Sequence, residues 1–334
     1  MVFVVEENCS TDNIAKTVRE YAGVRRKHAI GEIVHAFNFQ SEDVVVSFGE
    51  DSALIRNGED GLLLAADGIW SMLMQADPYW AGFCAVLVNV HDIAAMGGKP
   101  LAMVDILSVE DEKICHEVLR GMSDASSKFG VPVVGGHLHP DTDFSAIDVA
   151  IMGIVKTADA IYSHTACAGD RVVAAFDLDG RIHPSCALNW DSATLRSPEE
   201  LRLQIGVMQE LGKRHLVTAG KDISNPGVIG TLGMLLETSR KGAVIELAKI
   251  PRPDLSALEI PFSHWVRMYP GMGFILTAKE EYVEEIISLF ADVGMDAADI
   301  GYVDDTSNLT IKYHNKESSV FDLTKEGIMG LYVE

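Results

Sequence analysis

The sequence has little positive charge for its size. Its 334 residues contain 27 Lys and Arg against 49 Asp and Glu, which gives a formal net charge of −22 at pH 7. A surface of this kind repels nucleic acid phosphates and anionic lipid headgroups over most of its area. We therefore expect no nucleic acid partner and favour small molecules. A polyphosphate ligand would need bridging cations or a local basic patch.

Paired cysteines and long apolar runs are also missing. The five cysteines are scattered and never spaced as Cys-x-x-Cys, so the sequence indicates neither a disulfide framework nor a zinc site. No stretch approaches the roughly 20 apolar residues of a membrane-spanning helix. Residues 1–7 lack the basic and apolar regions of a signal peptide. We therefore expect a cytoplasmic protein without a membrane partner.

The chain does contain enough apolar sequence to fold, because 48% of its residues are hydrophobic and its length suffices for two cores. In the first half, hydrophobic periodicity predicts strands at 44–48, 61–66, 101–107, 131–134 and 147–155, and helices at 78–96 and 111–129. In the second half, it predicts strands at 171–176, 243–247, 273–277 and 309–313, and helices at 198–219, 226–240 and 280–293. Strands interspersed with helices in this order are typical of α/β or α+β folds.

The pattern loosens over residues 156–170 and then begins again with a strand. We place a domain boundary there, which divides the chain into residues 1–160 and 161–334. Residues 177–196 are too long for an ordinary connection, and we interpret them as a lid or a substrate loop.

Four short acidic segments place a carboxylate at the edge of an apolar run. They are residues 49–52, 65–68, 89–92 and 221–224. Mg²⁺ prefers octahedral oxygen ligation and usually takes a few protein carboxylates together with substrate phosphates. The four segments together therefore predict a metal-nucleotide site. Each segment alone is equally consistent with a turn or a helix cap.

These segments occur in the order and spacing found in the aminoimidazole ribonucleotide synthetase superfamily, which the chain resembles over nearly its whole length. The motifs that carry the resemblance are Glu-Asp-Ser-Ala at 50–53, Ala-Asp-Gly at 66–68, the block from Asn89 to Pro100, Gly-Gly-His at 135–137 and Asp-Ile-Ser-Asn-Pro-Gly at 222–227. The Asp-Ile-Ala-Ala-Met-Gly block within 92–97 is the most specific of them.

The resemblance implies an α+β fold with two α/β domains. The N-terminal domains of two subunits would pair into a shared β-barrel, so that the protein is a homodimer with ATP bound near the interface. The C-terminal domain would be an α/β sandwich that completes the active-site cleft. Members of the superfamily use ATP and Mg²⁺ to phosphorylate or activate a substrate, and such chemistry depends mainly on metal placement and charge neutralisation.

Carried over position by position, the resemblance implies a metal site and a nucleotide site. The metal ligands would be Asp51, Asp67, Asp92 and Asp222, with Glu50 as a further candidate. The residues that contact the nucleotide would be Gly49, Asp67, Gly68, Asn89, Gly135, Gly136 and His137. The catalytic candidates are Asp51, Asp92, His137 and Lys27.

Two features depart from the superfamily pattern or stand outside it. His137 follows the paired glycines where many members have an acidic residue, and with His139 it would share one face of an extended segment. A phosphate contact, a structural hydrogen bond and a transition-metal site are the alternatives. The basic run 25–28, which includes Lys27, either reaches over the phosphates or ends a solvated helix. Residues 263–273 are a substrate-pocket candidate or interdomain packing.

Within the superfamily, the chain looks most like the group called methanogenesis marker protein 2. Thiamine-monophosphate kinase is the closest characterised relative in motif spacing, although His137 and Asn225 replace residues that are acidic in that kinase. We therefore predict ATP- and Mg²⁺-dependent phosphoryl transfer to, or activation of, an unknown small-molecule acceptor. The alternative is a nucleotide-binding regulatory or assembly protein of the same fold that does not turn over.

Overall fold

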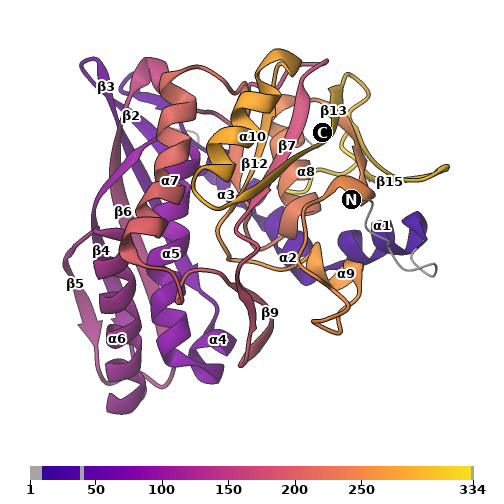
Figure 1. The fold of residues 1–334 in the computed structure, drawn as a ribbon. Helices are drawn as coiled ribbons and strands as arrows, with labels where there is room; N and C mark the ends of the chain where they lie inside the picture. The colour runs from indigo at the N-terminus through magenta and orange to yellow at the C-terminus, as the bar shows by residue number, and fades with distance from the viewer. Residues whose placement is uncertain (1–9, 38–40, 332–334) are drawn as a thin grey trace.

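Two mixed β-sheets and the helices between and outside them build the structure (Figure 1). It is a computed structural model that describes residues 10–37 and 41–331. Within this part of the chain, no helix is both long enough and apolar enough to cross a membrane.

The first sheet has the strand order β1-β2-β3-β6-β4-β5, and only the β4 and β5 pair is parallel. Its strands are β1 (Val44–Val46), β2 (Ala53–Asn57), β3 (Asp60–Ile69), β4 (Lys99–Ser108), β5 (Val133–His139) and β6 (Ala146–Lys156). The helices of this part are α4 (Ser71–Ala76), α5 (Pro78–Ala95) and α6 (Glu112–Phe129). The Asp77 carboxylate caps α5 by accepting from Trp80 N at 3.0 Å, and Pro78 takes the favoured first helical position.

The second sheet has the order β10-β12-β7-β13-β11-β14-β15, and only the β11 and β14 pair is parallel. Its strands are β7 (Arg171–Phe176), β10 (Ala219–Asp222), β11 (Gly242–Glu246), β12 (Gly273–Ala278), β13 (Asp296–Asp304), β14 (Asn308–Tyr313) and β15 (Lys316–Asp322). The remaining helices are α1 (Thr11–Glu20), α2 (Ala22–Arg25), α3 (Ala29–Ala36), α7 (Pro198–Lys213), α8 (Gly227–Ser239), α9 (Phe262–Trp265) and α10 (Val283–Ala291). Short 3₁₀ turns occupy Arg26–His28, Thr157–Asp159, Leu247–Lys249 and Glu280–Tyr282.

Both faces of the second sheet are covered. Successive residues of a strand point to opposite faces of the sheet, and here the residues on both faces are apolar. On β7, Val173 and Ala175 belong to a core shared with α5 and the first sheet, whereas Val172 and Ala174 pack with α1 and α8. The N-terminal helix α1 therefore lies on the second sheet, and Arg19 Nη1 donates to Ser319 O at 2.8 Å. The two sheets and α5 are joined through one continuous core.

The first sheet buries only one face. Leu63 and Met103 point toward the helices and are fully or almost fully buried, whereas Leu64, Ile106 and Met152 are 48%, 52% and 42% exposed. The strand register places these three side chains on the same side of the sheet. We call this surface the open face.

Most predicted elements of regular structure are confirmed to within a few residues, including the strand at 171–176. The helix predicted at 198–219 ends earlier, at Lys213, because His215 takes a left-handed conformation and Leu216 N bonds back to Leu211 O. The segment 177–196 is not simply irregular, since it contains a hairpin of β8 (Arg181–His183) and β9 (Cys186–Asp191).

The mixed α+β class is confirmed. Both sheets are open in the part of the chain that the structure describes, so no barrel closes within one copy. A barrel shared between two subunits stays a prediction, because it needs a second copy of the chain.

Candidate functional site

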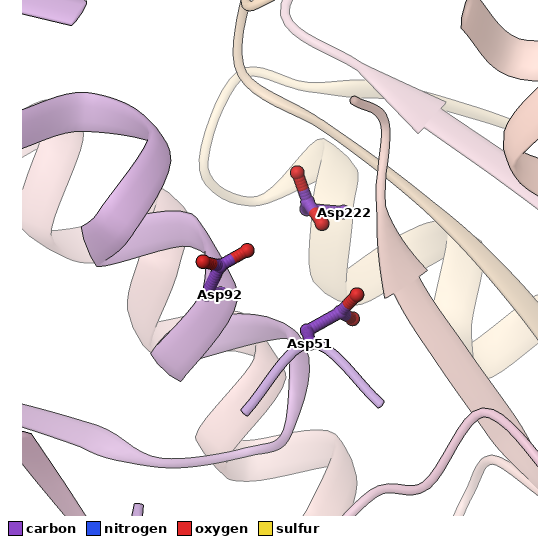
Figure 2. A group of neighbouring side chains, drawn as sticks. All are labelled: Asp51, Asp92 and Asp222. Atoms are coloured by element: carbon purple, nitrogen blue, oxygen red, sulfur yellow. The ribbon is translucent and has the colours of Figure 1, made fainter. Parts of the chain in front are cut away.

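Three carboxylates from distant parts of the sequence meet where α5 approaches the edge strand β10 (Figure 2). Asp51 lies in the bend before β2, Asp92 in the last turn of α5, and Asp222 at the end of β10. One carboxylate oxygen from each lies within 4.8 Å of the others. We call this group the acidic triad. Asp51 and Asp92 come from the first half of the chain and Asp222 from the second.

Local structure explains why each carboxylate stands where it does. Gly49 has a φ of +100°, and a Cβ at this position would lie 2.9 Å from the Thr238 side chain, so glycine suits the turn that presents Asp51. Asp92 stands at the carboxyl end of a helix, where the helix dipole disfavours an anion and favours a cation. The triad therefore needs positive charge nearby.

Lys221 supplies one such charge. Its ammonium bonds Asp51 Oδ1, and the two side chains are only 3% and 6% exposed. Burial would lower the pKa of Lys221, but the charges of Asp51, Glu50 and Asp222 outweigh burial and raise it. Lys221 is therefore a fixed cation. Lys221 has no role among the residues predicted from the sequence; its local signal is a lysine directly before Asp222 at the end of an otherwise apolar strand.

Several buried acceptors near the triad have no hydrogen-bond partner. They are Asp51 Oδ2, Ser52 Oγ and Asn89 Oδ1. Asn89 lies one helical turn before Asp92, and its Nδ2 donates to Ala85 O at 2.8 Å while its oxygen stays free. Buried polar atoms without partners are uncommon and call for an explanation such as an ion. Carboxylate and amide oxygens are the ligands that Mg²⁺ prefers.

The electrostatics of the triad point the same way. Burial and the neighbouring carboxylate of Asp51 raise the pKa of Asp222 to about 8. Burial, together with Asp67, Asp222 and Asp51, raises the pKa of Asp92 well above its ordinary range. Like charges held together in a desolvated place favour the protonated forms unless a cation is added. The triad is arranged so that a divalent ion would relieve this repulsion.

Asp67 and the basic run lie within electrostatic range of the triad. Asp67 still reaches solvent, but the protein atoms packed around its carboxyl raise its pKa by desolvation, and the charges of Lys27 and Arg26 oppose that shift. Lys27 also acts on Asp51 and Asp222. Lys27 and Arg26, which lie in the 3₁₀ turn that follows α2, are therefore near enough to act on the pKa of these carboxylates, and a contact with phosphate stays a prediction.

Glu50, in contrast, is not part of the triad. Its Oε2 accepts from Ser163 N at 2.6 Å, and its Oε1 pairs with His164 Nδ1 at 2.5 Å. Burial would raise the pKa of Glu50, but these hydrogen bonds and the charge of Lys221 hold it below its usual range. Glu50 ties the turn at Gly49 to the start of the second domain.

The glycine motif lies elsewhere on the first sheet. His137 pairs in register with Ile106 on the open face, the side away from α5, and its ring lies 4.5 Å from that of His139. Gly136 lies against Asp105, where a Cβ would come within 2.4 Å of Oδ1. Gly135 precedes it on β5, and the whole strand is exposed. One chain therefore does not bring His137 to the triad.

Gly68 also relates to the open face. A Cβ at Gly68 would lie 2.2 Å from Asp148 Oδ1, so the absence of a side chain there makes room for Asp148 on the neighbouring strand β6. Asp67, the next residue along β3, points to the opposite side, toward the helices. Asp67 of the Asp-Gly motif therefore lies on the helix side of the sheet, near the triad, whereas Asp148 beside Gly68 lies on the open face.

The segment 263–273 packs between the domains. Trp80 Nε1, on α5, donates to Asn189 Oδ1 at 2.8 Å, and Asn189 Nδ2 donates to Tyr269 O at 3.0 Å. His91 Nε2 lies 2.7 Å from Met272 Sδ, and burial lowers the pKa of His91 to about 3. These contacts hold α5, and with it Asp92, against the second domain.

Comparison with known proteins places both halves of the chain. Residues 49–155 match the N-terminal domain of AIR synthase related proteins, and residues 169–314 match their C-terminal domain. An uncharacterized protein of Methanocaldococcus jannaschii is 47% identical over 322 residues, covering 95% of this chain and 98% of its own length.

Two solved structures share the fold. PurL of Thermotoga maritima, solved in complex with ATP, has a TM-score of 0.76 and 16% identity, and the match covers 94% of this chain but 52% of that longer chain. AaThiL, solved in complex with AMPPCP and TMP, has a TM-score of 0.64 and 20% identity, with 87% and 94% covered. Because the two domain matches together span most of the sequence, this chain belongs to the AIR synthase related protein family.

Proposed function

We propose that the protein is an ATP- and Mg²⁺-dependent phosphotransferase or ATP-activated synthetase acting on a small molecule. The observation that carries the proposal is the acidic triad, in which three segments of the chain present carboxylate oxygens within 4.8 Å of one another. The family relationship supports it, since PurL and AaThiL were solved with ATP and AMPPCP, respectively.

The residues present suit Mg²⁺. Asp51, Asp92 and Asp222 offer hard oxygen ligands, and Asp51 Oδ2 is buried without any partner. When bound, the ion would hold the triphosphate and neutralise charge on the transferring phosphoryl group. Asp67 lies in electrostatic range of the same carboxylates and is a further candidate ligand.

The chain's own residues would do the rest. Lys27 and Arg26 supply cations beside an otherwise acidic site, and such side chains stabilise phosphoryl oxygens by charge-assisted hydrogen bonds. Asn89 presents a free buried oxygen one helical turn from Asp92. The helix α5 contacts Met272 directly and Tyr269 through Asn189, and these contacts hold Asp92 in place beside Asp222.

We propose further that the domain division lies near residue 160 and that two copies pair through the open face. The two family matches end at 155 and begin at 169, on either side of this division. Val104, Ile106 and Met152 expose apolar surface there, and uncovered apolar sheet faces are typical of interfaces. A homodimer built in this way would cover His137 and His139, which share that face.

The test is phosphate release from ATP and Mg²⁺ with fractionated metabolites of the source cell, compared between the wild-type protein and Asp92→Asn. We expect one fraction to stimulate release by the wild type and not by the variant. If ATP with Mg²⁺ binds but no fraction stimulates release, the regulatory or assembly alternative holds. If neither binding nor release occurs, the proposed function is wrong.

A further inference from the structure

Lys221 is the one buried lysine among the buried charged residues of the described chain, and its ammonium stands inside the acidic group. Lysine is strongly hydrated and is seldom fully buried unless it is paired. Here it bonds Asp51 Oδ1, and both side chains of the pair are buried. Its position is therefore fixed by the carboxylates that would otherwise hold metal.

The ammonium of Lys221 occupies one of the two carboxylate oxygens of Asp51, Oδ1, so that this oxygen is not open to a metal ion. One divalent ion can use Asp51 Oδ2 together with oxygens of Asp92 and Asp222. A second divalent ion would have to approach Asp51 against the ammonium, with only Asp51 Oδ2 free of a partner.

We infer that Lys221 is a built-in cation that takes the place of a second divalent ion at Asp51, so that the triad binds a single ion. This inference rests on the proposed function, because it assumes that the triad is a metal site. It makes Lys221 a positioning residue that sets the metal count of the centre, and it gives Asp51 two tasks, one for each carboxylate oxygen.

The experiment is a Mn²⁺ titration of the full chain without nucleotide, followed by the electron paramagnetic resonance signal of free Mn²⁺. Mn²⁺ is used because carboxylate oxygens suit it as they suit Mg²⁺. We count as ions of the triad those that the wild type binds and Asp222→Asn does not. This difference leaves out ions held loosely by the acidic surface. We expect one such ion per chain in the wild type and two in Lys221→Met.

Two further variants sharpen the result. Lys221→Arg keeps the positive charge and should keep one ion. Lys241→Met, which removes a lysine paired with Asp305 on the surface, should also leave the count at one. Two ions in the wild type, or the same count in Lys221→Met as in the wild type, would overturn the inference. If Lys221→Met does not fold, the wild-type count alone decides.

The outcomes separate this inference from the proposed function. If Asp222→Asn loses no ion, the triad is not a metal site and both fail. If the triad binds Mn²⁺ but Lys221→Met leaves the count unchanged, the inference about Lys221 fails and the proposed function stands.

Discussion

Replacing Asp222 by asparagine should stabilise the protein when no metal is present. The pKa of Asp222 is about 8 against an ordinary value of 3.8. Each pH unit between 3.8 and 7.5 adds about 1.36 kcal/mol to the cost of keeping this carboxyl in the folded state, which gives about 5 kcal/mol at pH 7.5. This value already includes the attraction to Lys221, so we expect Asp222→Asn to gain a few kcal/mol, at most about 5 kcal/mol.

The sign follows from the direction of the shift. A carboxyl whose folded pKa is raised costs stability only above its unfolded pKa, so the gain from Asp222→Asn should shrink to about one third at pH 5. The assay is urea unfolding in EDTA at pH 7.5 and pH 5, repeated with Mg²⁺ and ATP. With the ligand present the order should reverse, because the wild type gains binding energy that the variant cannot.

Asp177→Asn is the matched control, because Asp177 is also a buried carboxylate but is fully engaged. It accepts from Arg196 Nη2 at 2.7 Å and from Gln204 Nε2 at 2.9 Å. Its replacement should destabilise the protein with or without ligand. If Asp222→Asn is destabilised in EDTA in the same way and still responds to ATP with Mg²⁺, Asp222 is a structural residue and not a metal ligand.

Three further predictions follow from single residues. Burial lowers the pKa of His91 to about 3, so between pH 7 and pH 5 only the unfolded wild type takes up this proton, and the wild type should lose about 2 kcal/mol of stability through it. His91→Leu should not show that loss. An unchanged difference between the urea curves at the two pH values would contradict this. Lys27→Met should weaken binding of ATP with Mg²⁺ about tenfold by calorimetry while changing apo stability by less than about 0.5 kcal/mol, and equal affinity would remove Lys27 from the site. Ile106→Asp should leave a folded monomer by light scattering, whereas Leu195→Asp, an exposed apolar position outside the first sheet, should not change the mass; a monomeric wild type would refute the dimer.

Much of the fold could be predicted because its signals are local. The helix α5 has Asp77 and Pro78 at its start and Gly97 just beyond its end, which are residues typical of helix ends, and the structure begins and ends the helix there. The hairpin β8 and β9 could not be predicted from periodicity, because its strands are short and are held by long-range contacts. Trp190 Nε1, for example, donates to Asp177 O at 2.9 Å.

The site, like the fold, could be predicted where its signals are local and could not be predicted where it depends on long-range contacts. Asp51, Asp92 and Asp222 were named because each ends an apolar run in a recognisable motif, and the structure brings them together. The partners of Glu50 and the reach of Lys221 depend on how the two domains meet, which sequence spacing does not encode. The motif alone assigns His137 to the nucleotide, and strand alternation puts it on the open face, so its contact with a nucleotide stays a prediction.

The most direct test of the central claim is a crystal of the full chain grown with Mn²⁺ and a non-hydrolysable ATP analogue, measured at the manganese absorption edge. We expect anomalous density about 2.2 Å from oxygens of Asp51, Asp92 and Asp222, next to the triphosphate. Anomalous density only at other places, or a triphosphate bound away from the triad, would contradict it.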